Sequence, residues 1–218
     1  MEKLYFVLFL VKVVQSVDGQ ESESVCRPTP HDIVGPYYFP RPPPLIQYCT
    51  GDPESHRLEN MIVRGHVYKA DCLTPLPRVR IEVWQADHAG VYQFSTQCRG
   101  FIRTDALGYY EFSTIHPGQY TIDRQNLMYR PSHIHFRVFG RRRHKGLITQ
   151  LYFAGDPYLG RNDSCSICSS GNPDLIKQPK QLCDDADKYC MDVVDFDIVL
   201  ERGSGTSVTQ EGPNDITE

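Results

Sequence analysis

Short runs of alternating apolar and polar residues recur through the middle of this chain, and many of their apolar members are β-branched or aromatic. Such period-two alternation places successive side chains on opposite faces of an extended strand. Turn signals at 75–77, 106–108 and 117–118 separate the runs. The pattern therefore predicts an all-β fold, an antiparallel β-sandwich, with strands at 62–68, 79–84, 109–112, 132–139, 148–153 and 193–200.

Little helix is expected, because helical periodicity is weak throughout; a short helix is plausible only at 174–187. The segment 20–57 is rich in proline, which predicts an extended N-terminal arm rather than a helix. The predicted β-sandwich domain occupies 58–202. The polar, glycine- and serine-containing residues 203–218 are expected to form a flexible tail.

The first nineteen residues have the layout of a secretory signal peptide. A charged start precedes an apolar run at 4–14 that contains only Lys12 as a charge, and small residues follow at Ser16 and Gly19. The run is too short for a membrane span. We expect cleavage after Gly19, with Ser16 as the alternative, and an extracellular, secreted protein.

Cysteine usage agrees with export, since an even number of cysteines in a secreted chain indicates disulfides. Cys165 and Cys168 have the spacing of half a zinc site, but Cys183 and Cys190 are too far apart to complete it. Asn162 begins a glycosylation acceptor. The pairing is left open among the eight: Cys26, Cys49, Cys72, Cys98, Cys165, Cys168, Cys183 and Cys190.

The net charge of −4 argues against nucleic acid and anionic membrane as partners, because both need a basic face. One basic run, at 141–145 (RRRHK), departs from this balance. It is interpreted as a solvated loop between strands. The alternative is that it forms the rim of a pocket for anionic substrates.

His133 and His135 are the first candidate metal ligands. Residues i and i+2 of a strand share a face, so both imidazoles project side by side with their Cα atoms about 6.5 Å apart. This spacing allows both rings to reach one ion. A lone HxH in a strand is weak evidence, since such pairs are more often unrelated polar positions.

Neighbouring residues strengthen the metal hypothesis. Arg130 stands three positions before His133, and Gln150 on the returning strand is able to face the same pocket. Tyr92 and Tyr120 each follow a glycine-containing turn. Either tyrosine alone is more often an amphipathic residue at the edge of a core.

Several blocks of the chain resemble the intradiol ring-cleavage dioxygenases, the catechol and protocatechuate dioxygenase family. The resemblance covers about 33–158, and the 35–38 match (GPYY) is looser than the rest. A prealbumin- or immunoglobulin-like sandwich topology is implied by it. The matching blocks are 83–92 (VWQADHAGVY), 103–112 (RTDALGYYEF), 114–120 (TIHPGQY), 130–136 (RPSHIHF) and 147–156 (LITQLYFAGD).

The resemblance implies a mononuclear non-haem Fe(III) site. Its ligands fall on Tyr92, Tyr120, His133 and His135, with Tyr120 also a catalytic base. The family's catalytic arginine and pocket glutamine correspond to Arg130 and Gln150. Either Tyr37 or Tyr38 is expected to line the substrate pocket.

The implied reaction inserts both atoms of O2 into a catechol and gives a cis,cis-muconate-type product without an external reductant. The ligand set suits this chemistry, because two hard, strongly donating phenolates favour Fe(III) over softer or divalent ions.

Two departures from the family are visible. Tyr92 and Tyr120 lie 28 positions apart (120 − 92), closer than we expect of bacterial members, which predicts a more open site. The chain also lacks the long helical N-terminal segment through which bacterial catechol dioxygenases dimerise, so a monomer is expected. The layout is similar to secreted single-domain arthropod members, for which dietary or plant catechols are plausible substrates.

Two other functions compete with this interpretation. Parts of the chain also fit non-catalytic transthyretin-like β-sandwich binding modules, although such modules lack the Arg130, His133, His135 and Gln150 group. A zinc or copper hydrolase built on the histidine pair would leave Tyr92 and Tyr120 unexplained.

Overall fold

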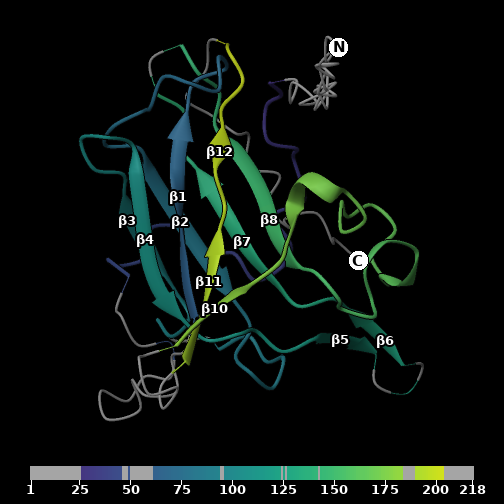
Figure 1. Ribbon diagram of the computed structural model, residues 1–218. Helices are drawn as coiled ribbons and strands as arrows, with labels where there is room; N and C mark the ends of the chain where they lie inside the picture. The colour runs from purple at the N-terminus through teal and green to yellow at the C-terminus, as the bar shows by residue number, and fades with distance from the viewer. Residues whose placement is uncertain are drawn as a thin grey trace, which may run out of the picture.

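Two five-stranded sheets dominate the structure, a computed structural model that describes residues 26–45, 49, 61–93, 96–123, 125, 127–141, 143–183 and 190–203 (Figure 1). The predicted signal peptide at 1–19, parts of the arm and almost all of the tail lie outside these ranges. The nearly all-β expectation is confirmed for the described residues.

The first sheet is built around β1 (Met61–Tyr68), which pairs antiparallel with β4 (Tyr109–Thr114). It also pairs in parallel with β11 (Cys190–Asp195) and β12 (Ile198–Val199), and β10 (Lys180–Cys183) extends the sheet beside β11. The predicted strand at 193–200 is therefore interrupted at Phe196 and Asp197, where the Arg64 carbonyl accepts a hydrogen bond from the Phe196 amide.

The second sheet has the order β3-β2-β7-β8-β9. Its strands are β3 (Arg99–Arg103), β2 (Arg80–Gln85), β7 (His133–Val138), β8 (Leu147–Phe153) and β9 (Ile176–Lys177). All neighbours run antiparallel except β8 and β9, which are parallel.

The expectation of purely antiparallel sheets was wrong, because both sheets are mixed. Parallel neighbours need a long connection between them. Here β11 pairs with β1, and β9 with β8, only after long intervening segments of the chain. Period-two alternation does not indicate the direction of a strand.

The two sheets pack face to face around a shared apolar core. Phe136 on β7 lies 6.2 Å from the Tyr110 ring on β4 and 5.2 Å from the Phe196 ring, measured between centroids. Phe136 and Phe196 are almost fully buried. The core therefore anchors β7, the strand that contains the histidine pair, through the face that carries Phe136.

The N-terminal segment 26–45 contains no helix and no strand longer than a bridge. It crosses both sheets by backbone hydrogen bonds from Thr29 to Val199, from Asp32 to Ile148 and from Leu45 to Phe101. Asp32 is thereby held beside β8.

All eight cysteines are paired, which confirms the disulfide expectation. The pairs are Cys26–Cys72, Cys49–Cys98, Cys165–Cys168 and Cys183–Cys190. Cys165 and Cys168 bond to each other, so they are not half of a zinc site.

The prediction of a helix at 174–187 was wrong for the described residues of that segment. A single 3-10 turn at Pro173–Leu175 leads into β9, and β10 ends at Cys183. Pro179 between the two strands removes an amide that a helix would need, and β9 gains sheet hydrogen bonds beside Tyr152. Within the described ranges no helix is long and apolar enough to cross a bilayer.

A separate two-stranded ribbon consists of β5 (Tyr120–Asp123) and β6 (Met128–Arg130). Its register places Tyr120 opposite Arg130. The backbone pairing alone therefore brings together two candidate site residues that are ten positions apart in the chain.

Candidate metal centre

The histidine pair lies near the start of β7, on a strand bordered by sheet neighbours on both sides. His135 is opposite Trp84 of β2 and Gln150 of β8. Both imidazoles are almost completely buried, and their Nε2 atoms are 3.2 Å apart. The expected side-by-side projection is confirmed.

Tyr92 completes a triangle of donor atoms with the two histidines. Its hydroxyl lies 3.0 Å from His133 Nε2 and 3.2 Å from His135 Nε2. Ligands at right angles around an ion, with bonds of about 2.1 Å to nitrogen or oxygen, are themselves separated by about 3 Å. The triangle therefore fits three positions of one coordination sphere.

The second nitrogen of His133 fixes which ring atom faces the triangle. His133 Nδ1 is 2.6 Å from the Pro131 carbonyl oxygen, to which its N–H donates. The Nε2 atom is then unprotonated and presents a lone pair. Such a partner is what metal-binding histidines ordinarily have.

Electrostatics keeps both rings neutral. Burial, followed by the charge of Arg130, lowers the pKa of His133 to about 3. Burial also lowers the pKa of His135 well below its ordinary value, with His133 and Arg130 adding to the effect. Burial raises the pKa of Tyr92, so a cation must supply the charge that stabilises its phenolate.

Two glycines hold the Tyr92 and Tyr120 loops against each other. Gly90 has φ +76°, and a Cβ there would lie 2.0 Å from the Gln119 carbonyl oxygen. A Cβ on Gly118 would lie 2.4 Å from the Gly90 amide nitrogen. The Asp87 carbonyl accepts hydrogen bonds from both glycine amides. The backbones approach closely because neither position has a side chain.

Replacing Gly90 with alanine should therefore separate these loops, lowering stability by about 1–3 kcal/mol and reducing metal content strongly. Gly155→Ala is the matched control, because Gly155 has φ +88° but a Cβ added there would meet nothing within 4 Å. Metal analysis and thermal unfolding of both variants measure the difference. Equal metal content in the two variants would contradict this role of Gly90.

Tyr120 lies beside the triangle. Its ring is edge-on to that of Tyr92, with 5.5 Å between centroids, and its hydroxyl is 2.8 Å from that of Tyr37. Tyr37 in turn stacks on Tyr92 with 4.3 Å between centroids. Tyr120 and Tyr37 are both partly exposed, so this is the open side of the site.

Of the two tyrosines considered for the pocket, the structure brings only Tyr37 to the metal centre. Tyr38 packs against Trp84 and donates its hydroxyl proton to Glu82 at 2.7 Å. Arg99 holds the intervening backbone by donating to the Tyr37 carbonyl at 2.9 Å.

Arg130 is buried beside His133, with 3.4 Å between its Nη1 and His133 Nε2. Its Nε lies 3.2 Å from Asp163 Oδ1, in an ion pair whose carboxylate is fully buried. Its Nη2 donates to Gln150 Oε1 at 3.2 Å and to Tyr152 Oη at 3.0 Å. Burial alone would lower the pKa of Arg130, but Tyr152 and Asp163 reverse this and raise it.

Gln150 and Tyr152 are held in turn by the N-terminal segment. Gln150 Nε2 donates to the Ile33 carbonyl at 2.9 Å, and Tyr152 Oη lies 2.8 Å from Asp32 Oδ2. Asp32 also accepts a hydrogen bond from the Ser169 amide at 3.1 Å. These contacts fix the orientation of the Arg130 guanidinium.

Sequence reasoning missed Tyr152, Asp32 and Asp163. Tyr152 had a usable signal, because it lies two residues after Gln150 on one strand and so shares its face. Asp32 and Asp163 contact the site across 120 and 33 positions of the chain, and no local pattern marks them.

The fold and the site together define a class of protein. It is a β-sheet protein in which a buried cluster of tyrosine and histidine donors lies beside an arginine. The family model described as Dioxygenase matches residues 33–202. The chain therefore belongs to the intradiol dioxygenase family, which confirms the resemblance seen in its motifs.

Named relatives agree with this membership. Catechol 1,2-dioxygenase 2 of Acinetobacter lwoffii is 33% identical over 60% of this chain and 53% of its own length. The protocatechuate 3,4-dioxygenase beta chain of Burkholderia cepacia is 38% identical over 46% of this chain and 47% of its own. The chain spans about half the length of the curated relatives it matches.

Solved structures show the same fold. Catechol 1,2-dioxygenase from Acinetobacter sp. ADP1 superimposes with a TM-score of 0.66 at 28% identity, covering 80% of this chain and 63% of that one. The dioxygenase domain of a carbohydrate-binding fusion protein from Streptomyces sp. SirexAA-E gives 0.61 at 28% identity, covering 81% and 100%.

Proposed function

We propose that this chain is an Fe(III)-dependent intradiol dioxygenase that inserts both atoms of O2 into a catechol and gives a cis,cis-muconate-type diacid. The observation that carries the proposal is the donor triangle of Tyr92, His133 and His135, with sides of 3.0–3.2 Å. Family membership supplies the reaction class.

Tyr92, Tyr120, His133 and His135 would hold the ion. Two neutral imidazoles and two phenolates are a hard nitrogen and oxygen donor set, which suits Fe(III). Within the described residues no cluster of three His, Cys, Asp or Glu side chains could hold a metal, so a hydrolase-type zinc site has no third ligand there. A bound ferric ion would supply Lewis acidity toward the catechol oxygens and would activate the ring toward O2.

Tyr120 is the residue that we propose as a base. Burial and the hydrogen bond with Tyr37 raise the pKa of Tyr120, so its phenolate has a strong affinity for a proton. Its partly exposed position lets an arriving catechol reach the Tyr120 Oη atom. The Tyr37 hydroxyl would then donate a hydrogen bond to that oxygen or accept one from it, which keeps the Tyr120 ring in place.

Arg130 would stabilise negative charge that develops on the substrate ring. Its guanidinium is permanently charged, buried and fixed by three neighbouring side chains before substrate arrives. Charge stabilisation by a preorganised group in a water-poor site is usually a major contribution to catalysis. Asp163, Tyr152 and Gln150 act through Arg130 as positioning residues.

The test is turnover of catechol by ferric-loaded protein under 18O2. The expected product is a ring-opened diacid that carries label from both atoms of one O2 molecule, found by mass spectrometry, with stoichiometric oxygen uptake. Catechol binding without oxygen uptake would contradict the proposal and favour a non-catalytic transthyretin-like binding module.

We further propose that the protein is secreted and monomeric. Four disulfides among the described residues support an oxidising compartment. Size-exclusion chromatography with light scattering tests the second point, and a stable dimer would contradict it.

A further inference from the structure

The basic run at 141–145 lies away from the metal centre. It belongs to the connection between β7 and β8, beyond Val138, whereas His133 begins β7. At about 3.3 Å per residue, roughly 17 Å of strand separates His133 from the end of β7. The run therefore does not border the metal centre.

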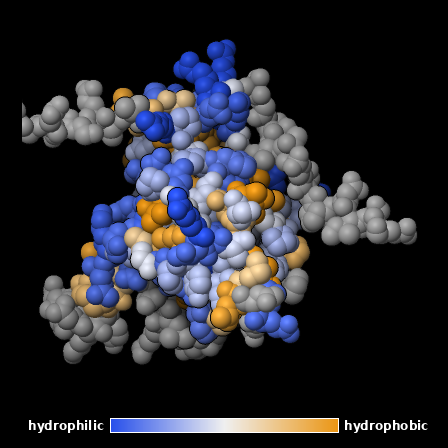
Figure 2. All heavy atoms as spheres, turned by 90° about the vertical axis from the view of Figure 1, so that its right-hand side faces the viewer, coloured by the Kyte–Doolittle hydropathy of each residue, from blue (hydrophilic) through white to orange (hydrophobic). Residues whose placement is uncertain are grey.

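Three residues of the run, Arg141, Arg143 and His144, line a cavity of about 480 Å³. This volume lies within the range of small-molecule sites. The turn after β1 lines the same cavity with residues 69–71 and 75–77, and Arg202 lines it as well. Figure 2 shows strongly hydrophilic residues in deep blue at the top of the molecule, the end at which β1 and β12 finish in Figure 1.

Positive charge dominates this cavity. Its lining includes four cationic side chains and one carboxylate, a formal charge of +3, in a protein whose net charge is −4. Among the residues that the structure describes, none of these four forms an ion pair with a carboxylate. The cations are Lys69, Arg141, Arg143 and Arg202.

The one carboxylate, Asp71, is already engaged within its own turn. Asp71 Oδ1 accepts from the Leu73 and Thr74 amides, and Asp71 Oδ2 accepts from the Thr74 hydroxyl at 2.6 Å. It is therefore poorly placed to neutralise the arginines across the cavity.

The cavity is built on paired backbone. His144 and Arg202 form an antiparallel bridge, and the Arg143 carbonyl accepts a hydrogen bond from the Gly203 amide at 2.9 Å. His144 is buried, and Arg141 donates to the Pro77 carbonyl. The positions from which Arg143 and Arg202 project are thus fixed.

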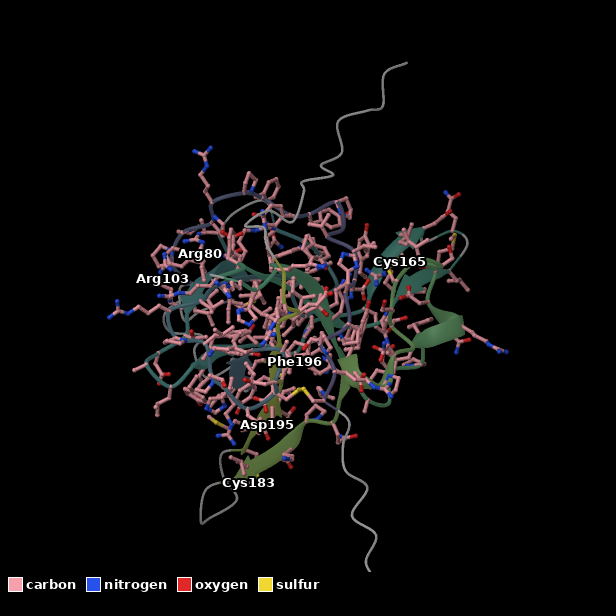
Figure 3. All side chains as sticks on the ribbon, turned by 90° about the horizontal axis from the view of Figure 1, so that it is seen from above. Arg80, Arg103, Cys165, Cys183, Asp195 and Phe196 are labelled. Carbon is pink, nitrogen blue, oxygen red and sulfur yellow. A yellow bond between two sulfur atoms is a disulfide. The ribbon has the colours of Figure 1, made fainter. Side chains whose placement is uncertain are left out.

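More arginines continue the basic surface beyond Arg141, which also lines a neighbouring cavity with Arg78, Arg80 and Arg103. Arg80 and Arg103 lie side by side at one edge of the molecule, on the side opposite Cys165 (Figure 3). Arg80 is paired with Glu82 at 2.8 Å, whereas Arg78 and Arg103 have no ion pair among the described residues. The field of these groups adds to that of the first cavity.

We propose that the cavity lined by 69–71, 75–77, Arg141, 143–144 and Arg202 is a binding site for a small anion with two or three negatively charged oxygen groups, of the phosphate or polycarboxylate class. Guanidinium groups bind such groups through paired, charge-assisted hydrogen bonds. An anion of this charge would match the cationic lining. The site is separate from the metal centre and does not depend on the proposed dioxygenase activity.

The test is isothermal titration calorimetry of the full chain with pyrophosphate and, separately, with citrate at fixed ionic strength. Binding of either supports the site, and the stronger one identifies phosphate or carboxylate as the preferred class. In Arg143→Gln/Arg202→Gln, affinity for that anion should fall by about tenfold or more. Both side chains are exposed, so folding should be unaffected.

Arg161→Gln/Lys180→Gln is the matched control, since it removes the same charge from exposed positions outside the cavity. Its affinity should stay close to that of the parent. Equal loss in both double variants would mean general charge attraction and overturn the proposal. So would no binding of either anion.

The acidic residues of 204–218 offer one further outcome. If the parent binds neither anion but Glu211→Gln/Asp215→Asn/Glu218→Gln binds one, the chain's own segment fills the cavity, and the free-ligand proposal is overturned.

Discussion

Replacing His133 with alanine should remove most of the bound iron and nearly all dioxygenase activity while leaving the sheets folded. The His133 Nε2 atom is 3.0 Å from Tyr92 Oη and 3.2 Å from His135 Nε2, so it is one of the three corners of the donor triangle. Even residues that only orient metal ligands cost about 10- to 100-fold in affinity or activity when changed. Loss of a direct ligand should exceed this.

Metal analysis after purification and oxygen uptake with catechol measure the effect. His66→Ala is the matched control, because His66 is a partly exposed histidine on β1, in the other sheet. It should retain its iron and its activity. A His133→Ala protein with full iron content and full activity would refute the assignment of this ligand.

Arg130→Met should be damaging in two separable ways. It removes a charge beside the reacting centre, for which a rate loss of about 100- to 1000-fold is expected. It also leaves Asp163 buried without its partner, and breaking a buried ion pair from one side costs about 3–5 kcal/mol of stability. The Asp163 side chain is fully buried, so water cannot solvate the carboxylate that has lost its partner.

The double variant Arg130→Met/Asp163→Asn separates the two effects. Asparagine keeps an oxygen for the Cys165 amide, which donates to Asp163 Oδ1 at 2.9 Å, and it removes the unpaired charge. Stability should recover most of its loss, whereas activity should not. Urea unfolding and steady-state kinetics measure the two quantities. Recovery of activity together with stability would show that Arg130 serves only structure.

Much of this site could be predicted because its chemistry is local in the sequence. Alternation in β7 places His133 and His135 on one face. The ribbon that places Tyr120 opposite Arg130 was not predicted, although its two strands lie close together in the sequence. The motif order located Tyr92 and Gln150 by resemblance. Each of these positions is determined by a strand or a turn of a few residues.

The remainder depends on contacts that no local pattern encodes. The choice between Tyr37 and Tyr38 required the course of the N-terminal segment over the site. Asp32 and Asp163 reach Tyr152 and Arg130 from loops without regular structure. Strand direction was likewise beyond a pattern that records only which face is buried, so the parallel pairing of β1 with β11 was not foreseen.

The most direct test of the central claim is the visible absorption of the ferric-loaded protein, recorded with and without catechol in the absence of O2. The ligand set predicts equimolar iron, a red-brown colour from tyrosinate-to-iron charge transfer, and a shift of that band when catechol is added. Iron-free, colourless protein after loading, or a band that catechol leaves unchanged, would contradict a catechol-binding ferric site formed by these tyrosines and histidines.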